Sequence, residues 1–202
     1  MKPTRGRGDV VLPRLELETA RLRLRPVCLE DAEAVYTSIR ESIEPLARWM
    51  DWCHAGYSRE DGAAWIASTR SGWEAGGAYE FLLFERSGRH VGAVGLNQFN
   101  RENNCANLGY WVRRSSQRQG YAVEAVRRIA RFAFAEAKFQ RVEIVVAVDN
   151  AASRRVAARA GATLECVARN RLLLHGVPIA AAVHSFVPGD LQRGDAAPTI
   201  RL

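Results

Sequence analysis

A strand-like pattern changes to a helical pattern within residues 108–138, LGYWVRRSSQRQGYAVEAVRRIARFAFAEAK. This stretch opens with a short apolar run, and from Val123 onward apolar side chains recur at helical spacing. Between the two, QRQGYA (117–122) places a glycine where a strand would become a helix. A helix N terminus presents unpaired N–H groups and a positive dipole end, and a glycine lets a ligand approach the backbone closely. The segment therefore fits a phosphate-binding loop, and an ordinary strand–helix turn is the alternative.

Three short apolar runs lead up to this loop: AYEFLLFER (78–86), HVGAVGLNQF (90–99) and NCANLGYWV (104–112). The segments SGRH and NRENN that separate them have the composition of turns, so we expect three antiparallel strands joined as hairpins. After the helix, VEIVVAV (142–148) is continuously apolar. That pattern predicts a central strand covered on both faces.

The remaining segments complete the order of elements. We expect a strand at 21–25, helices at 29–42, 58–75 and 150–161, a broken helical piece at 42–52, and strands at 163–174 and 179–188. Ser58 and Asp61 have the spacing of a capping box at the start of one helix. This order predicts an α/β fold with a mixed sheet in a single domain, residues 15–188. We expect residues 1–14 to be a flexible leader and residues 189–202 a loose tail.

Composition limits the classes of partner. The chain has 202 residues and a net charge of +7, which suits a phosphorylated ligand or nucleic acid. The arginines are dispersed along the sequence, so nucleic acid is not the expected partner. No apolar run approaches a membrane span, and the first residues lack a secretory signal, so we expect a cytoplasmic protein without a membrane partner. The four cysteines and four histidines form no C-x-x-C or H-x-x-x-H pair, so we expect no metal.

Several motifs taken together resemble a known family. Gln117, Gly120 and Ala122 match the Q/R-x-x-G-x-G/A acyl-CoA signature of the GNAT (general N-acetyltransferase) superfamily. The chain is similar in particular to the RimJ/RimL-like branch, which acetylates protein N-terminal amines, including those of ribosomal proteins. LGYWV before the loop, DNAASRRVAARAGA, TLEC and the paired-tryptophan segment ARWMDW (47–52) carry this resemblance. Ala162 and Cys166 depart from the residues usual in that branch.

The resemblance implies a mostly antiparallel central sheet flanked by helices, with central strands that splay to admit acetyl-CoA. It also implies that the acetyl group passes directly to a primary amine in a ternary complex, first of all to a protein N-terminal α-amine. Residues 111 and 112 would supply backbone N–H groups to the carbonyl. The expected cofactor-binding residues are Trp111, Val112, Arg113, Gln117, Arg118, Gln119, Gly120, Tyr121, Ala122, Asn150 and Ser153.

Two residues are expected to carry the chemistry. Glu165 lies between apolar Leu164 and Cys166, where a raised pKa would suit a general base; a surface strand glutamate is the alternative. The resemblance places Ser153 as the acid for the departing thiolate, and it could equally cap the helix, as could Asn150. Cys166 as a nucleophile has no evident histidine partner, so an acyl-enzyme is not expected.

The sequence gives several possible acceptor amines. The residues expected to line its side are Trp49, Trp52, Tyr79, Asn97 and Tyr110, and core packing is the alternative for the two tryptophans. A small amine such as an antibiotic, polyamine or amino acid is the alternative acceptor. A non-catalytic acyl-CoA sensor is the rival function, and the sequence leaves open a monomer or a homodimer.

Overall fold

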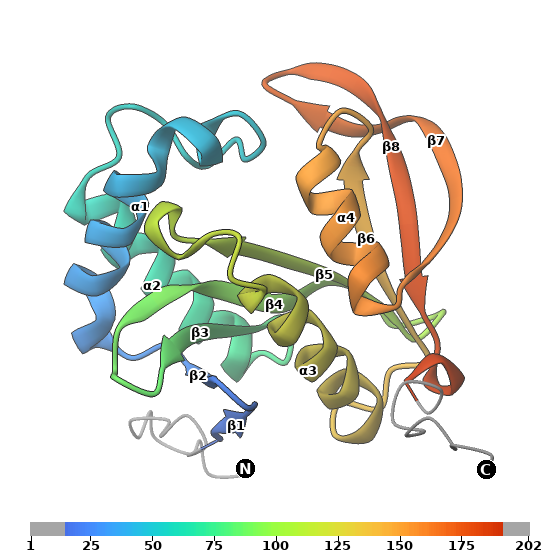
Figure 1. Cartoon of the computed structure of the whole chain (residues 1–202), viewed down its shortest axis with the longest axis horizontal. Helices are drawn as coiled ribbons and strands as arrows, with labels where there is room; N and C mark the ends of the chain where they lie inside the picture. Colours follow the sequence, from blue (N-terminus) through green and yellow to red (C-terminus); the bar gives the residue numbers. More distant parts are fainter. Residues whose placement is uncertain (1–14, 192–202) are drawn as a thin grey trace, which may run out of the picture.

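The computed structural model describes residues 15–191, which build one eight-stranded sheet in the order β1-β2-β3-β4-β5-β6-β8-β7 (Figure 1). The strands are β1 (Leu17–Glu18), β2 (Leu22–Pro26), β3 (Tyr79–Glu85), β4 (His90–Asn100), β5 (Cys105–Val112), β6 (Arg141–Ala147), β7 (Thr163–Leu174) and β8 (Val177–Phe186). The β5–β6 pair is parallel, and the other neighbouring pairs are antiparallel. The predicted mixed, mostly antiparallel sheet is confirmed, including the two hairpins between β3 and β5.

Four helices cover the sheet from both sides (Figure 1). They are α1 (Ala32–Ala47), α2 (Arg59–Glu74), α3 (Tyr121–Ala135) and α4 (Ala151–Ala160). The apolar stripes of α3 and α4 pack with Leu83, Leu96 and Leu108, whereas α1 and α2 pack with Leu82 and Ala93. Because successive side chains of a strand point to opposite faces, these are two separate cores on the two faces of one sheet.

The parallel pair β5–β6 separates after a short length. Its pairing covers only residues 105–107 of β5 and 141–143 of β6, and the two strands diverge beyond Asn107 and Glu143. The sheet is therefore divided into a half containing β1–β5 and a half containing β6, β8 and β7, which open away from each other (Figure 1). The predicted splay of the central strands is confirmed.

Most of the predicted helix starts and ends are confirmed. Ser58 caps α2 in a capping box with Asp61, and Gly161 ends α4 in the left-handed conformation. The predicted break near residue 42 is wrong, because α1 continues through Pro45 to Ala47. The predicted cover on both faces of β6 is also wrong.

In β6, buried residues alternate with half-buried ones such as Glu143 and Val145, because one face of the strand lies along the opening of the sheet. The expected leader (1–14) lies outside the described residues, as does the expected tail from residue 192 onward. Pro188–Asp190 form a short 3-10 turn. Among residues 15–191, no helix combines the length and the hydrophobicity needed to cross a membrane.

Candidate active site

A pocket of about 200 Å³ lies where β5 and β6 separate. Residues 108–110 of β5 and 144–147 of β6 form its two walls, and Asn150 and Ser153 close one end. Residues 49–51, after α1, and residues 172–174, on β7, form its rim. Four residues expected at the site are thereby brought together: Trp49, Tyr110, Asn150 and Ser153.

The backbone of β5 directs alternate amides into this opening. The Arg113 N–H donates to the Val91 carbonyl of β4 at 2.8 Å. Every second residue of a strand points its amide the same way, so the amides of Trp111 and Gly109 also point toward β4. The N–H and C=O groups of Tyr110 and Val112 therefore point the other way, toward β6. In agreement, the Val112 carbonyl accepts from the Gln117 side chain at 3.2 Å. Of the two predicted backbone donors, Val112 faces the opening and Trp111 does not.

The loop between β5 and α3 leaves a helix N terminus without a side-chain cap. Gly120 is the N-cap residue of α3 with φ +85°, and as a glycine it makes no side-chain hydrogen bond to the first helical amides. Most residues are strained at this φ, which accounts for the glycine. The amides of Tyr121 and Ala122 are thus available at the positive end of the helix, as a phosphate site requires.

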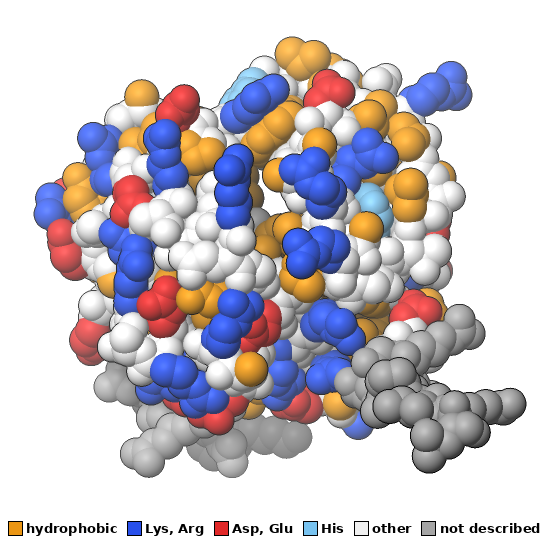
Figure 2. All heavy atoms as spheres, viewed as in Figure 1, with side chains coloured by type: hydrophobic (Ala, Val, Ile, Leu, Met, Phe, Trp, Pro, Cys, Tyr) orange, Lys and Arg blue, Asp and Glu red, His pale blue; other side chains and the backbone are white. Residues whose placement is uncertain are grey.

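Positive side chains border the same region. Figure 2 views the molecule from the face that carries α3 and α4, where the surface is hollowed between its two halves and Lys and Arg side chains gather along both sides. Arg118 is exposed in the loop, and Arg155 and Arg159 are exposed on α4. This charge suits a polyanionic ligand that enters the opening from this side.

Tyr110 and Ser153 form a hydroxyl pair at the end of the pocket. The Tyr110 hydroxyl lies 2.8 Å from Ser153 Oγ and 3.0 Å from the Ser153 carbonyl oxygen. The Ser153 N–H donates to Asn150 Oδ1 at 3.0 Å, so Asn150 caps α4 as the sequence allowed. Burial raises the pKa of Tyr110 to about 12. The Tyr110 hydroxyl therefore keeps its proton at neutral pH and can donate it to a group inside the pocket.

Comparison with known proteins identifies the family behind this arrangement. The family described as "Acetyltransferase (GNAT) domain" matches residues 21–163. This chain belongs to the GNAT acetyltransferase family. It is an acetyl-CoA-dependent N-acetyltransferase.

Relatives of this acetyltransferase agree with the RimJ/RimL-like resemblance. A Vibrio cholerae structure assigned as a ribosomal-protein-serine acetyltransferase is 35% identical, with a TM-score of 0.75 over 87% of this chain and 99% of that chain. The ribosomal-protein-serine acetyltransferase of Escherichia coli (strain K12) is 26% identical over 144 residues, which are 71% of this chain and 80% of that protein. RimL, a ribosomal L7/L12 α-N-protein acetyltransferase solved with coenzyme A, shares the fold: its TM-score is 0.79 over 86% of this chain and 98% of that chain, at 22% identity.

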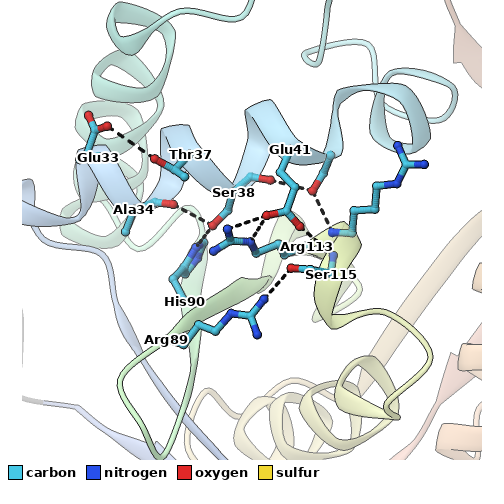
Figure 3. Close-up of polar contacts among 11 residues, drawn as sticks. Glu33, Ala34, Thr37, Ser38, Glu41, Arg89, His90, Arg113 and Ser115 are labelled. Atoms are coloured by element: carbon cyan, nitrogen blue, oxygen red, sulfur yellow. Dashed lines mark hydrogen bonds and ion pairs between the residues drawn. The ribbon is translucent and has the colours of Figure 1, made fainter.

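The Arg113 side chain of the acetyltransferase is occupied elsewhere. Its guanidinium donates to Glu41 of α1 at 2.6 Å, and the Ser115 N–H donates to the same carboxylate at 2.8 Å (Figure 3). The Arg113 side chain, with its hydrogen bond the largest cause, lowers the pKa of Glu41 to about 2. The Arg113 side chain therefore ties the end of β5 to α1, and cofactor binding by Arg113 stays a prediction.

Glu165 also differs from its expected state. It lies at the start of β7 in a two-pronged ion pair with Arg141 and accepts a hydrogen bond from Ser185 at 2.7 Å. These partners, Arg141 first, lower its pKa to about 2. The raised pKa expected for a general base is wrong, because a cation lies where an apolar environment was expected. An anion held by arginine at this pKa is a poor proton acceptor at neutral pH.

Glu165→Gln is accordingly expected to leave turnover within about twofold of wild type, with the same pH–rate profile from pH 5 to 9. The free energy of unfolding should fall by less than about 1 kcal/mol, since the pair is partly exposed. A carboxylate whose pKa falls from 4.5 to about 2 on folding contributes stability above pH 4.5, and that contribution disappears as pH falls through 2. Chemical denaturation of wild type and Glu165→Gln at pH 7 and pH 2 measures this contribution to the free energy of unfolding. A large loss of turnover with a changed pH profile would restore Glu165 as the base.

The expected acceptor residues divide between the two faces of the sheet. Tyr79 packs against Trp73, Phe99 and Phe132 on the α3 face, next to the core and outside the residues that line the β5–β6 pocket. Trp52 lies beside Trp111 and Tyr57, with ring centroids 6.4 and 6.2 Å away. It borders a second pocket of about 210 Å³ between α1 and α2 rather than the β5–β6 opening.

Asn97 lies on the α1–α2 face, where it meets a residue that the sequence analysis missed. Its side-chain amide donates to Glu80 Oε1 of β3 at 3.0 Å, and its own oxygen accepts from Asn107 at 2.9 Å. Burial raises the pKa of Glu80 to about 7. The available signal was the glutamate inside the apolar run AYEFLLF, where a charged residue has no evident reason to be. Within residues 15–191, no group of three or more His, Cys, Asp or Glu side chains is arranged to hold a metal.

Proposed function

We propose that this enzyme acetylates the N-terminal α-amine of a protein. The observation that carries the proposal is the rim of the β5–β6 opening, where two chain segments lie on either side of the pocket and offer mainly apolar side chains. Such a rim suits an extended chain end better than a compact cation. The names of the Vibrio cholerae and Escherichia coli relatives support the same class of acceptor. A ribosomal-protein acceptor would place the reaction in the cytoplasm.

The residues of the opening fit acetyl-CoA. The uncapped amides at Tyr121 and Ala122 would hold its diphosphate, and the walls between β5 and β6 would enclose its pantetheine arm. Gly120 keeps the approach to these amides free of a side chain. When bound, acetyl-CoA supplies an acyl group activated as a thioester.

The chain's own groups can assist the transfer at two points. The amides of Tyr110 and Val112, which face the opening, are placed to donate to an oxygen that gains negative charge. The Tyr110 hydroxyl, held by Ser153, is placed to give its proton to the departing sulfur. Ser153 then acts as the partner that positions Tyr110, while Asn150 fixes the start of α4.

The rim limits the charge that an acceptor can carry. Asp51 is the acidic residue among those lining the pocket, and it is already engaged by the hairpin between β7 and β8. Its carboxylate accepts from the His175 N–H at 2.8 Å. A polyamine or an aminoglycoside needs several free carboxylates, so a single α-amine followed by a neutral chain fits better.

A panel of acceptors tests this proposal. Free thiol released from acetyl-CoA is measured with N-terminal peptides, polyamines and aminoglycosides at equal concentration. We expect kcat/KM for at least one peptide to exceed that of every small amine by about tenfold or more, the scale that 1.4 kcal/mol of added contacts supplies. The same peptide with an acetylated N terminus and an internal lysine is the matched control and should not react. Faster turnover of a small amine would refute the protein acceptor.

A further inference from the structure

Glu80 is a carboxylate on the α1–α2 face of the sheet that the reaction outlined above does not use. Its side chain crosses over the neighbouring strand: a Cβ atom built on Gly95 would lie 1.9 Å from Glu80 Oε2. Glu80 and Gly95 are direct partners in the β3–β4 register. The carboxylate thus rests on β4, displaced from its own strand toward β5.

Two adjacent glycines lie between Glu80 and the pocket, and the Asn97 side chain lies beside them, since its Nδ2 would be 3.8 Å from a Cβ built on Gly109. Gly95 pairs with Gly109 on β5, and Gly109 itself lines the β5–β6 pocket. Adjacent strands lie about 4.8 Å apart, so the carboxylate over Gly95 is one strand away from the pocket wall. Because neither glycine has a side chain, nothing on these two residues stands between Glu80 Oε2 and the opening.

Hydrogen bonds fix one carboxylate oxygen and leave the other free. Asn107 donates to Asn97, and Asn97 donates to Glu80 Oε1, which orients the carboxylate. Among residues 15–191, no hydrogen bond reaches Glu80 Oε2. Glu80 Oε2 is not among the fully buried polar atoms that lack a partner, so it keeps some contact with solvent.

We propose that Glu80 is the general base that takes a proton from the acceptor amine. This inference deepens the proposed function and rests on the β5–β6 opening being the place of acetyl transfer. The ammonium form of the acceptor gives one N–H proton to Glu80 Oε2, and the freed lone pair forms the new C–N bond. As the C–S bond breaks, the sulfur takes the bonding pair and a proton from Tyr110. The second proton lost by the nitrogen returns to the Tyr110 hydroxyl through water, and Glu80 releases its own proton to solvent.

The electrostatic surroundings of Glu80 suit this role. Burial is the larger influence on its pKa and raises it to about 7, while the hydrogen bond from Asn97 acts in the opposite direction. The elements around it offer neutral groups: Asn97 on β4, Asn107 on β5, and Trp73 on α2, whose indole donates to the Glu80 carbonyl at 2.9 Å. Across from Asn107, Glu143 of β6 is paired with Arg141 at 3.0 Å and with Arg171 at 3.6 Å. Glu143 is thereby engaged in ion pairs. The pKa of about 7 lets Glu80 exchange a proton at neutral pH.

The test compares Glu80→Gln with wild type at saturating acetyl-CoA. We expect kcat to fall about 100-fold, with acetyl-CoA affinity unchanged. The wild-type kcat should decrease as pH falls through about 7, because protonated Glu80 cannot accept a proton, and the variant should lack this decrease. Glu102→Gln, in the exposed β4–β5 turn, is the matched control and should behave as wild type. A Glu80→Gln variant within threefold of wild type would overturn the proposal.

A second variant moves the carboxylate without removing it. Gly95→Ala introduces a Cβ that cannot coexist with the present position of Glu80 Oε2, so the carboxylate must leave its place over Gly95. We expect its kcat to fall by at least tenfold while the KM for acetyl-CoA stays within twofold. Unchanged kcat in Gly95→Ala would show that the position of the carboxylate over Gly95 is irrelevant to the reaction.

A measurement that needs no turnover tests the role of Glu80 independently of the identity of the acceptor. Carbon-13 NMR titration of the glutamate carboxyls in the free protein, with Glu80→Gln to assign the signal, should give a midpoint near 7. A midpoint at the ordinary glutamate value would overturn the role of Glu80 whatever the acceptor is. The kinetic comparison uses whichever amine wild type acetylates fastest. Failure of all peptides therefore refutes the protein acceptor, and the result for Glu80 still stands on the amine that reacts.

Discussion

Gly120→Asp is expected to weaken acetyl-CoA binding by about 100-fold or more. The backbone φ of +85° places any new side chain at the uncapped start of α3, and its Cβ would lie 3.3 Å from Arg21 Nη2. The Arg21 guanidinium is already paired with Glu124 at 2.7 Å, so it is not free to form a second ion pair with an added carboxylate. Two like charges about 4 Å apart near a protein surface repel by about 4 kcal/mol, which exceeds the 2.7 kcal/mol that a 100-fold loss requires.

Gly120→Asn is the matched control for this prediction. Asparagine has the same shape as aspartate and tolerates the left-handed conformation comparably, but it carries no charge. Its acetyl-CoA affinity, measured by isothermal titration calorimetry, should stay within about tenfold of wild type. Equal losses in the two variants would mean that steric exclusion, and not the charge of a bound diphosphate, explains the effect.

Tyr110→Phe is expected to lower kcat by about 100-fold while the KM for acetyl-CoA changes little. In the proposed mechanism the hydroxyl is the proton donor at the end of the pocket, and its pKa of about 12 keeps it protonated at neutral pH. Rates are measured as thiol release under saturating substrates. Melting temperature serves as the check on folding, since the lost hydrogen bonds are worth about 1 kcal/mol each.

Ser153→Ala distinguishes the two hydroxyls of the pair. If Tyr110 is the donor, this variant should lose less than about tenfold in kcat, because Tyr110 keeps its hydrogen bond to the Ser153 backbone carbonyl. Nearly full activity in Tyr110→Phe together with a large loss in Ser153→Ala would reverse the two roles. The sequence-based assignment of the acid to Ser153 would then be the correct one.

The fold was predictable because its signals are local. The glycine before α3, the capping box of α2 and the alternating runs of β3 to β5 each depend on residues close together in the chain. The positions of α3, α4 and the final hairpin follow from the same kind of pattern. The continuation of α1 through Pro45 was missed, because the sequence does not show the tertiary packing that stabilises its last turn.

The chemistry of the site depends on contacts between distant residues, and here the sequence misled. Glu165 has apolar neighbours in the chain, but its environment is set by Arg141, 24 residues away. Arg113 follows a strand end at a loop suited to phosphate, yet Glu41 of α1 engages it from 72 residues away. A glutamate inside an apolar run is the one local signal of Glu80, and it does not show the burial that raises the pKa or the crossing of the carboxylate to the neighbouring strand. Only the register of β3, β4 and β5 places it near the opening.

A crystal structure of the enzyme with acetyl-CoA would show whether acetyl transfer occurs in the β5–β6 opening. We expect the diphosphate at the amides of Tyr121 and Ala122, and the pantetheine arm between β5 and β6. The thioester carbonyl should lie within hydrogen-bonding distance of an amide of β5, either Tyr110 or Val112. The Tyr110 hydroxyl should lie next to the sulfur. A complex with the pantetheine arm outside this opening, or with the thioester remote from Tyr110, would contradict the account.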